Sequence, residues 1–171
     1  MNTRQFALLS MLTALCVGIQ LTPRPPNVEF TSLICFTVGA IFGIQAGAFL
    51  GGLTMFTNSF VSPWGFAGLI TPFQMIGMVI IGIVGGIYGK SVKGNTSAHL
   101  TSIEAATLGA FLTLIYDVIT NAACAPWYNW NVILALIMGT WFTILHVGSN
   151  TVLFGFMFSP LSKIVKRLYG G

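Results

Sequence analysis

The chain has 171 residues, of which 55% are hydrophobic and 6% are charged, and its mean hydropathy is +0.87. Soluble domains carry about 25% charged residues, and disordered chains combine low hydrophobicity with high charge, so both classes are excluded. A membrane-spanning helix needs ~20 apolar residues, so this length holds about six such helices. We therefore expect residues 1–171 to form one integral-membrane domain, with no room for a second, soluble domain.

The formal net charge is +4, but the seven basic residues form no run that could follow a phosphate backbone. We therefore expect no nucleic-acid partner. The three cysteines are odd in number and show no Cys-x-x-Cys spacing, which predicts free thiols. Arg4 precedes an apolar run, as in a signal segment, but no small-x-small cleavage site follows, so we expect this run to remain as a helix.

Four apolar spans are clear in chain order, at residues 5–21, 72–89, 102–124 and 131–158. Residues 28–57 are ambiguous, because one helix of that length would measure ~45 Å, whereas the hydrocarbon core is ~30 Å thick. Two helices that turn near residues 43–47 place nearly all basic residues on one side of the membrane, as the positive-inside rule requires; Arg24 is the exception. The sequence therefore predicts an all-α bundle of six transmembrane helices in the plasma membrane, with both termini in the cytoplasm.

This topology places residues 22–29, 58–71 and 125–130 outside the cell. The proline-rich run at residues 22–27 is unsuited to a helix and predicts a rigid outer cap. Three of the four tryptophans lie in the outer connections, where an interfacial aromatic belt and a ligand site both remain open. Amide side chains lie near the same helix ends, and together with the aromatic rings they favour a pocket for a largely uncharged, flat organic ligand. These amides are Asn27, Asn58, Gln74, Asn121, Asn129 and Asn131.

Small residues recur at four-residue spacing in two stretches of the chain. Gly39, Gly43, Gly47 and Gly51 form a ridge that lets helix backbones approach closely, and we expect this ridge to pack inside the bundle. Ser10, Ala14 and Gly18 form a weaker ridge in the first helix, where internal packing and a partner protein both remain open.

Ionisable and amide side chains also lie deep within two predicted spans. Asp117 and Asn121 share one helix face, as do His146 and Asn150. Charged groups at such depth are costly and mark functional sites, although an interhelical hydrogen bond is the simpler alternative. Glu29 is expected at the outer surface, as a charge favoured by the N-terminus of the second helix. Two distant histidines and one buried acid make a poor metal site, so none is expected.

Residues 85–91 read Gly-Gly-Ile-Tyr-Gly-Lys-Ser, close to a phosphate-binding loop. Val84 stands where that motif requires its first glycine, and the run ends a predicted membrane helix instead of following a strand. We therefore expect this chain to bind no ATP.

The order of several short motifs resembles the substrate-binding S component of energy-coupling factor vitamin transporters, over nearly the whole chain. The motifs are Asn-Val-Glu-Phe-Thr-Ser at 27–32, the glycine ridge, Thr-Met-Phe-Thr-Asn at 54–58, Pro-Trp at 63–64 and Thr-Pro-Phe-Gln-Met at 71–75. Within that family the pattern is similar to the cobalamin and corrinoid-precursor members. Two features depart from it: residues 65–70 interrupt the pattern, and Phe73 stands in place of a tryptophan.

The resemblance implies a non-enzymatic subunit that captures a vitamin or vitamin precursor from outside, with no cofactor of its own. It also implies a transmembrane coupling subunit, bound through Ser10, Ala14 and Gly18, and two partner ATPases that consume ATP. The substrate site would include Asn27, Glu29, Asn58, Trp64, Gln74, Asp117, Asn121, Trp127, Asn129, His146 and Asn150. Two alternatives remain: an intramembrane enzyme that acts on a lipid or prenyl substrate through Asp117 and His146, and a ligand-free assembly subunit.

Overall fold

The computed structural model describes residues 3–23, 27–62, 66–92 and 102–169, and these form helices joined by short connections, without strands. Six α-helices account for most of them, and two short 3-10 helices, η1 (Gly68–Ile70) and η2 (Pro126–Tyr128), precede α4 and α6. The α-helices are α1 (Thr3–Leu21), α2 (Thr31–Phe42), α3 (Ile44–Val61), α4 (Thr71–Val92), α5 (Ser102–Cys124) and α6 (Val132–Tyr169).

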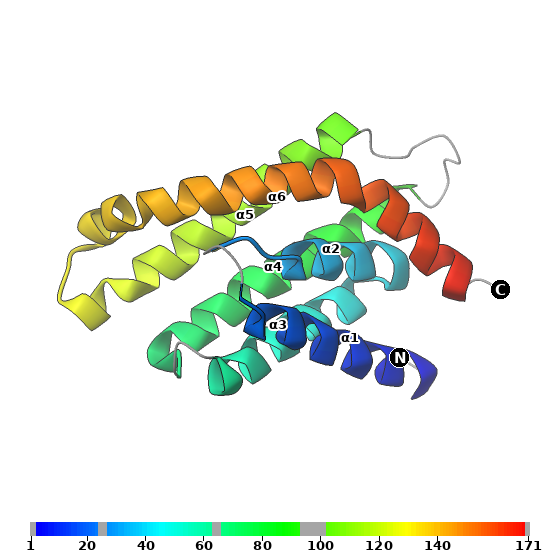
Figure 1. Cartoon of the computed structure of the whole chain (residues 1–171), viewed down its shortest axis with the longest axis horizontal. Helices are drawn as coiled ribbons and strands as arrows, with labels where there is room; N and C mark the ends of the chain where they lie inside the picture. Colours follow the sequence, from blue (N-terminus) through cyan, green and yellow to red (C-terminus); the bar gives the residue numbers. More distant parts are fainter. Residues whose placement is uncertain (1–2, 24–26, 63–65, 93–101, 170–171) are drawn as a thin grey trace.

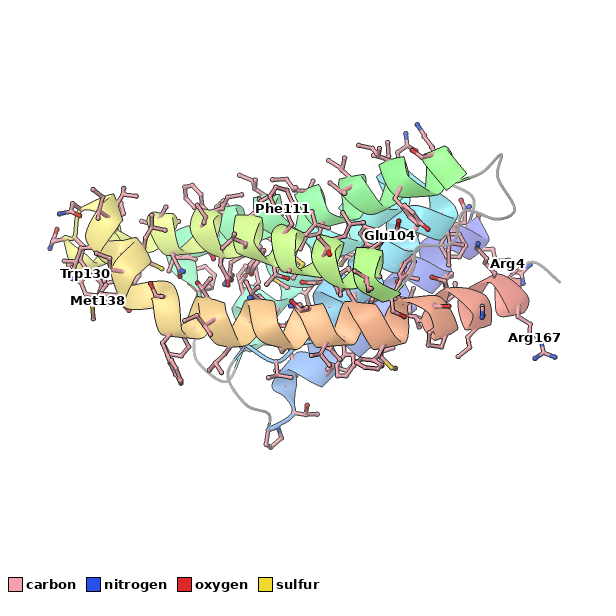
Figure 2. The ribbon with its side chains drawn as sticks, turned by 90° about the horizontal axis from the view of Figure 1, so that it is seen from above. Arg4, Glu104, Phe111, Trp130, Met138 and Arg167 are labelled. Carbon is pink, nitrogen blue, oxygen red and sulfur yellow. The ribbon has the colours of Figure 1, made fainter. Side chains whose placement is uncertain are left out.

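Successive helices run in alternating directions, so the two chain termini and the junction between α2 and α3 lie toward the same end of the bundle (Figure 1). Figure 2 shows Arg4 and Arg167 toward this end and Trp130 at the other. Lys90, Lys163 and Lys166 line a single pocket there. We call this the basic end and the other the opposite end. The described cationic side chains gather at one end, as the positive-inside argument predicts.

The ambiguous stretch at residues 28–57 forms two helices, as predicted. Gly43 separates α2 from α3, with φ of 95°, in a region that residues with a Cβ rarely adopt. Its N–H still donates to the carbonyl of Gly39 at 2.8 Å, which closes the last turn of α2. The predicted turn near residues 43–47 is therefore confirmed.

The helix α2 is too short to cross a membrane, unlike four of the other helices. The helices α1, α4, α5 and α6 are long and apolar enough to cross a membrane. With 12 residues, α2 measures ~18 Å, well short of a ~30 Å hydrocarbon core. The hydroxyl of Ser32 lies 3.9 Å from Sδ of Met78, well inside α4, so α2 begins within the bundle and runs toward the basic end.

The last helix is longer than predicted. The apolar span predicted for this helix ends at residue 158, whereas α6 continues through Pro160 to Tyr169 and bends in its last turns (Figure 1). A proline removes one hydrogen bond but does not have to end a helix, because the chain can bend away from the freed carbonyl. At 38 residues α6 measures ~57 Å and extends beyond a bilayer core.

Glycines bring α2 and α3 against α4. A Cβ on Gly39 would collide with the backbone of Gly82 and Gly86, and one on Gly51 would collide with the backbone of Met78. The predicted internal packing is therefore confirmed for Gly39, Gly47 and Gly51, whereas Gly43 lies at the break between α2 and α3, where a Cβ would meet nothing within 4 Å. Gly85, within the run that resembles a phosphate-binding loop, packs against the backbone of Phe36, and residues 85–91 are helical.

The helix α1 packs mainly against α3. Its buried face carries Leu9, Thr13, Cys16 and Val17. Ser10, Ala14 and Gly18 lie on the exposed side, and nothing lies within 4 Å of a Cβ built on Gly18. Of the two alternatives for this ridge, internal packing is therefore excluded within the described part of the chain.

Candidate functional site

A buried cluster of ionisable groups lies where α2 begins between α5 and α6. Nδ1 of His146 lies 2.8 Å from Oδ1 of Asp117, and Nε2 lies 3.5 Å from Oε1 of Glu29. The exposed fractions are 4% for His146, 5% for Asp117 and 6% for Glu29, so all three lie out of contact with surrounding lipid or water. The cluster holds two of the three carboxylates in the chain.

Two more residues complete the cluster. The amide of Asn150 donates to Oε1 of Glu29 at 3.5 Å, from one turn beyond His146 on α6. The backbone N–H of Ser32 donates to both carboxylate oxygens of Glu29, at 3.2 and 3.1 Å, and its hydroxyl donates to Oε1 at 2.5 Å. Glu29 therefore caps the N-terminus of α2, where the helix dipole stabilises a negative charge. We name Glu29, Ser32, Asp117, His146 and Asn150 the polar cluster.

The expected position of Glu29 at the outer surface is wrong, although its role at a helix N-terminus is confirmed. The segment before α2 enters the bundle and does not form a cap over its outer end. Asn27, with φ of 58°, donates through its side chain to the carbonyl of Phe142 at 3.1 Å. The hydroxyl of Ser149 donates to the Asn27 carbonyl, also at 3.1 Å. These contacts hold residues 27–30 against the middle of α6, and the predicted outer cap falls partly on residues 24–26, outside the described residues.

The polar cluster holds two acceptor atoms without a partner among the described residues. Oδ2 of Asp117 and Oδ1 of Asn150 are buried and accept no hydrogen bond. Unsatisfied buried acceptors are costly, and each calls for an explanation such as a bound ligand. Both atoms require a donor, which limits the chemistry of any group that binds between them.

Aromatic and sulfur-containing side chains surround the cluster. The ring of Tyr116 meets the imidazole of His146 edge-on, with centroids 5.8 Å apart, and its hydroxyl lies 3.7 Å from Sδ of Met55. A Cβ on Gly77 would collide with the same Tyr116 ring, so the glycine makes room for it. The low polarity of these neighbours strengthens electrostatic interactions inside the cluster.

Asn121 lies one turn from Asp117 on α5. Its side-chain amide donates to Oγ1 of Thr143 at 3.0 Å and packs against Gly139, where a Cβ would collide with it. Asn121 therefore joins α5 to α6 between the polar cluster and the opposite end.

The predicted aromatic residues do not share a pocket with the cluster. Trp127 is 57% exposed and lines an apolar cavity of about 780 Å³ with Phe73 and three residues of α5. These three, Ile119, Ala122 and Ala123, lie on the face of α5 that is turned away from Asp117 and Asn121. The structure therefore does not bring Trp127 together with Asp117 and Asn121, because helix periodicity places them on different sides of α5.

The remaining predicted residues lie near the opposite end. Asn58 is in the last turn of α3, Gln74 is in the first turn of α4, and both are half-buried. Asn129 is exposed and ends η2 in a left-handed conformation, with φ of 53°. Asn131 caps α6, with its side chain accepting from the N–H of Leu134 at 2.8 Å. Trp64 lies outside the described residues.

Three contributors to this region were not predicted from the sequence. Ser32 and Tyr116 sit in apolar helices, where a serine or tyrosine is common and carries no spacing signal. Gln20, near the end of α1, donates to Oγ1 of Thr31 at 2.9 Å and so ties α1 to the start of α2. Finding these residues would have required knowing how close the start of α2 lies to the neighbouring helices, and the sequence does not contain that distance.

The geometry of the cluster disfavours a metal ion. The two carboxylates contact different nitrogens of one imidazole, so the three side chains do not converge on a point. Within the described residues no group of three His, Cys, Asp or Glu side chains is arranged to hold a metal ion.

Comparison with known protein families, with curated proteins and with solved structures finds no match to this chain.

Proposed function

We propose that the chain is a membrane-embedded binding subunit of an importer of the energy-coupling factor type, and that the polar cluster is the inner wall of its ligand site. The observation that carries the proposal is the pair of buried, unpartnered acceptors on Asp117 and Asn150 beside a helix that begins inside the bundle. Transporters commonly place substrate sites where a discontinuous helix begins at mid-membrane depth.

The chemistry of the cluster selects a class of ligand. The two free acceptors, Oδ2 of Asp117 and Oδ1 of Asn150, each require a hydrogen-bond donor. A ligand with amide or amine N–H groups satisfies both requirements. A corrinoid carries several carboxamide side chains, so we retain cobalamin or a corrinoid precursor as the first ligand to test, on the strength of the motif resemblance.

Access to the cluster requires a movement of residues 27–30. Asn27 is held to α6 by hydrogen bonds with Phe142 and Ser149, and it lies two residues before Glu29. Release of this segment exposes the carboxylate of Glu29 and the start of α2 together. The segment therefore serves as the gate of the proposed site.

The same geometry disfavours the enzyme alternative. In a catalytic Ser-His-Asp arrangement, one ring nitrogen faces a carboxylate and the other faces a nucleophile. Both ring nitrogens of His146 face carboxylates, and the hydroxyl of Ser32 in the same cluster donates to Glu29. His146 is therefore placed to balance charge rather than to activate a nucleophile.

The coupling partner is proposed to bind α1. Ser10, Ala14 and Gly18 are exposed on one face of this helix, and a small-residue face permits close helix contact. A ligand-free assembly subunit would use the ridge of Gly39 and Gly51 instead, but that ridge is covered by α4.

The ligand site is tested by calorimetric titration of the purified chain with cobalamin and its precursors. Glu29→Gln should weaken binding at least tenfold, because it removes the charge that anchors the cluster. The matched control is Glu104→Gln, which makes the same change at the start of α5. Equal affinity in both variants would show that the polar cluster is not part of the ligand site. A lack of binding to any vitamin would contradict the importer proposal.

The coupling face is tested by affinity purification of the tagged chain from its own membranes. Wild type should retain a coupling subunit and two ATPases. Gly18→Leu should lose these partners, whereas Gly148→Leu on α6 should retain them. The two variants are matched, because a Cβ at either glycine meets nothing within 4 Å in the isolated chain. Retention of the partners by Gly18→Leu would exclude this face of α1.

A further inference from the structure

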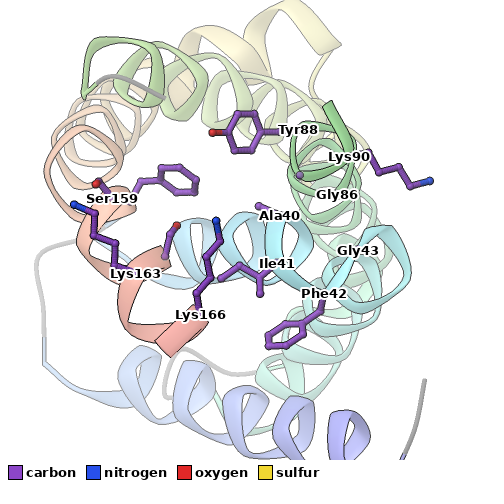
Figure 3. A pocket seen from close by; sticks show the side chains of 13 residues that line it. Ala40, Ile41, Phe42, Gly43, Gly86, Tyr88, Lys90, Ser159, Lys163 and Lys166 are labelled. Carbon is purple, nitrogen blue, oxygen red and sulfur yellow. The ribbon is translucent and has the colours of Figure 1, made fainter. Parts of the chain in front are cut away.

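A pocket of about 380 Å³ opens at the basic end, between the last turns of α2, the end of α4 and the tail of α6 (Figure 3). Its walls include the apolar side chains of Ile41, Phe42 and Phe158, and from the last turns of α6 Lys166 reaches over the pocket while Lys163 lies at its rim (Figure 3). The bend of α6 near Pro160 carries the tail across this end of the bundle (Figure 1). Together with Lys90 at the end of α4, three lysines therefore line this largely apolar pocket.

The pocket contains no carboxylate among its lining residues. The chain has only three acids, and Glu29 and Asp117 are committed to the polar cluster. The hydroxyl of Ser162, which also lines the pocket, is buried and has no hydrogen-bond partner in the described part of the chain. The pocket therefore presents ammonium groups and one unused hydroxyl to any occupant, which favours an anion with oxygen acceptors.

Two simpler explanations account for part of this arrangement. Lysines in the last turn of a helix offset the negative end of its dipole, and basic residues gather on the cytoplasmic side of membrane proteins. Neither explains why two lysines one turn apart line an apolar cavity, or why a buried hydroxyl stays unpaired beside them. Basic pockets between helices at a membrane surface commonly hold lipid head groups.

We propose that this pocket binds the phosphoryl head group of an anionic phospholipid, with Lys163, Lys166 and Ser162 contacting the phosphate oxygens. Ile41, Phe42 and Phe158 then contact the glycerol and the first acyl carbons. The apolar walls favour a lipid over free inorganic phosphate, since a small hydrated anion gains nothing from them. This proposal is independent of the importer proposal and concerns the other end of the bundle.

The test is native mass spectrometry of the purified chain in detergent with added phosphatidylglycerol or phosphatidylcholine. Wild type should retain one phosphatidylglycerol in preference to phosphatidylcholine. The double variant Lys163→Gln and Lys166→Gln should lower that retention about 25-fold, because each lysine contributes ~1 kcal/mol to the attraction of an anionic lipid. The matched control, Arg4→Gln with Arg167→Gln, removes two charges at the same end but none from the pocket lining.

Each outcome bears on the proposal. Loss of the lipid in the lysine variant, with retention in the arginine control, supports it, and Ser162→Ala should lower retention less than the lysine variant does. Equal retention in both double variants, or equal loss in both, would overturn the pocket assignment. Displacement of the lipid by equimolar inorganic phosphate would overturn the choice of a lipid. Circular dichroism of each variant shows whether helix content is kept.

Discussion

Substitution of Gly82 by alanine tests the packing that holds α3 against α4. A Cβ at this position would lie 2.7 Å from the backbone nitrogen of Ala48 and closer still to the carbonyl of Gly47, whereas ordinary contact begins at 3.4 Å. Both obstacles are backbone atoms, so no side chain can rotate away and the helices have to separate.

The magnitude follows from two opposing effects. Overpacking costs about 3 kcal/mol where the neighbours are rigid, and alanine gains about 1 kcal/mol of helix propensity over glycine. The net loss of about 2 kcal/mol lowers the melting temperature of a chain of this size by about 4–8 °C. Gly148→Ala is the matched control, because its Cβ meets nothing within 4 Å, and it should melt at or slightly above the wild-type temperature.

A thiol-reactive fluorescent dye measures this unfolding in detergent. Cys16 and Cys35 are free and buried, so they react only when the helices around them open. The half-buried thiol of Cys124 sets the starting signal. If Gly82→Ala melts at the wild-type temperature, the close approach of α3 to α4 is refuted.

Three further predictions address the break between α2 and α3, the cluster and the topology. Gly43→Ala should cost about 1–3 kcal/mol, because its φ of 95° strains any residue with a Cβ; an unchanged melting temperature in the same dye assay would contradict the helix break. His146→Leu should lower the free energy of unfolding by about 3–5 kcal/mol, because it leaves two buried carboxylates without their partner. Adding Asp117→Asn should recover part of this loss, whereas strictly additive losses would show that the two side chains do not interact. In a variant without native cysteines, Asn129→Cys should react with an impermeant maleimide in intact cells and Lys90→Cys only after permeabilisation. Labelling of Lys90→Cys from outside would exclude the proposed six-span topology.

Local patterns were sufficient for most of the fold. The apolar runs predict α1, α4 and α5 to within a few residues, because composition alone decides which segments suit a bilayer. The parity argument from basic residues correctly divides residues 28–57 into two helices. The apolar run at residues 131–158 does not show where α6 ends, because the helix continues through Pro160 and three basic residues to Tyr169.

The sequence predicted the residues of the polar cluster only as pairs within single helices. Four-residue spacing places His146 beside Asn150 and Asp117 beside Asn121, because residues one turn apart share a helix face. The same reasoning supplies no distance between helices, so it could not show that Glu29 lies against His146. It also grouped Trp127 with Asp117, although the two lie on opposite sides of α5.

The sequence by itself determined an all-helical chain with four helices apolar enough to cross a membrane, its described cations at one end and most of the glycine ridge inside. These properties follow from hydropathy, charge and local periodicity, which act within one segment. The tertiary structure decided that α2 begins inside the bundle, that Glu29, Asp117 and His146 meet there, and that three lysines line a pocket at the basic end. Such contacts join residues that are far apart in sequence, as Glu29 and His146 are at 117 positions, and they depend on how deeply each helix sits in the bundle, a quantity that no local pattern contains.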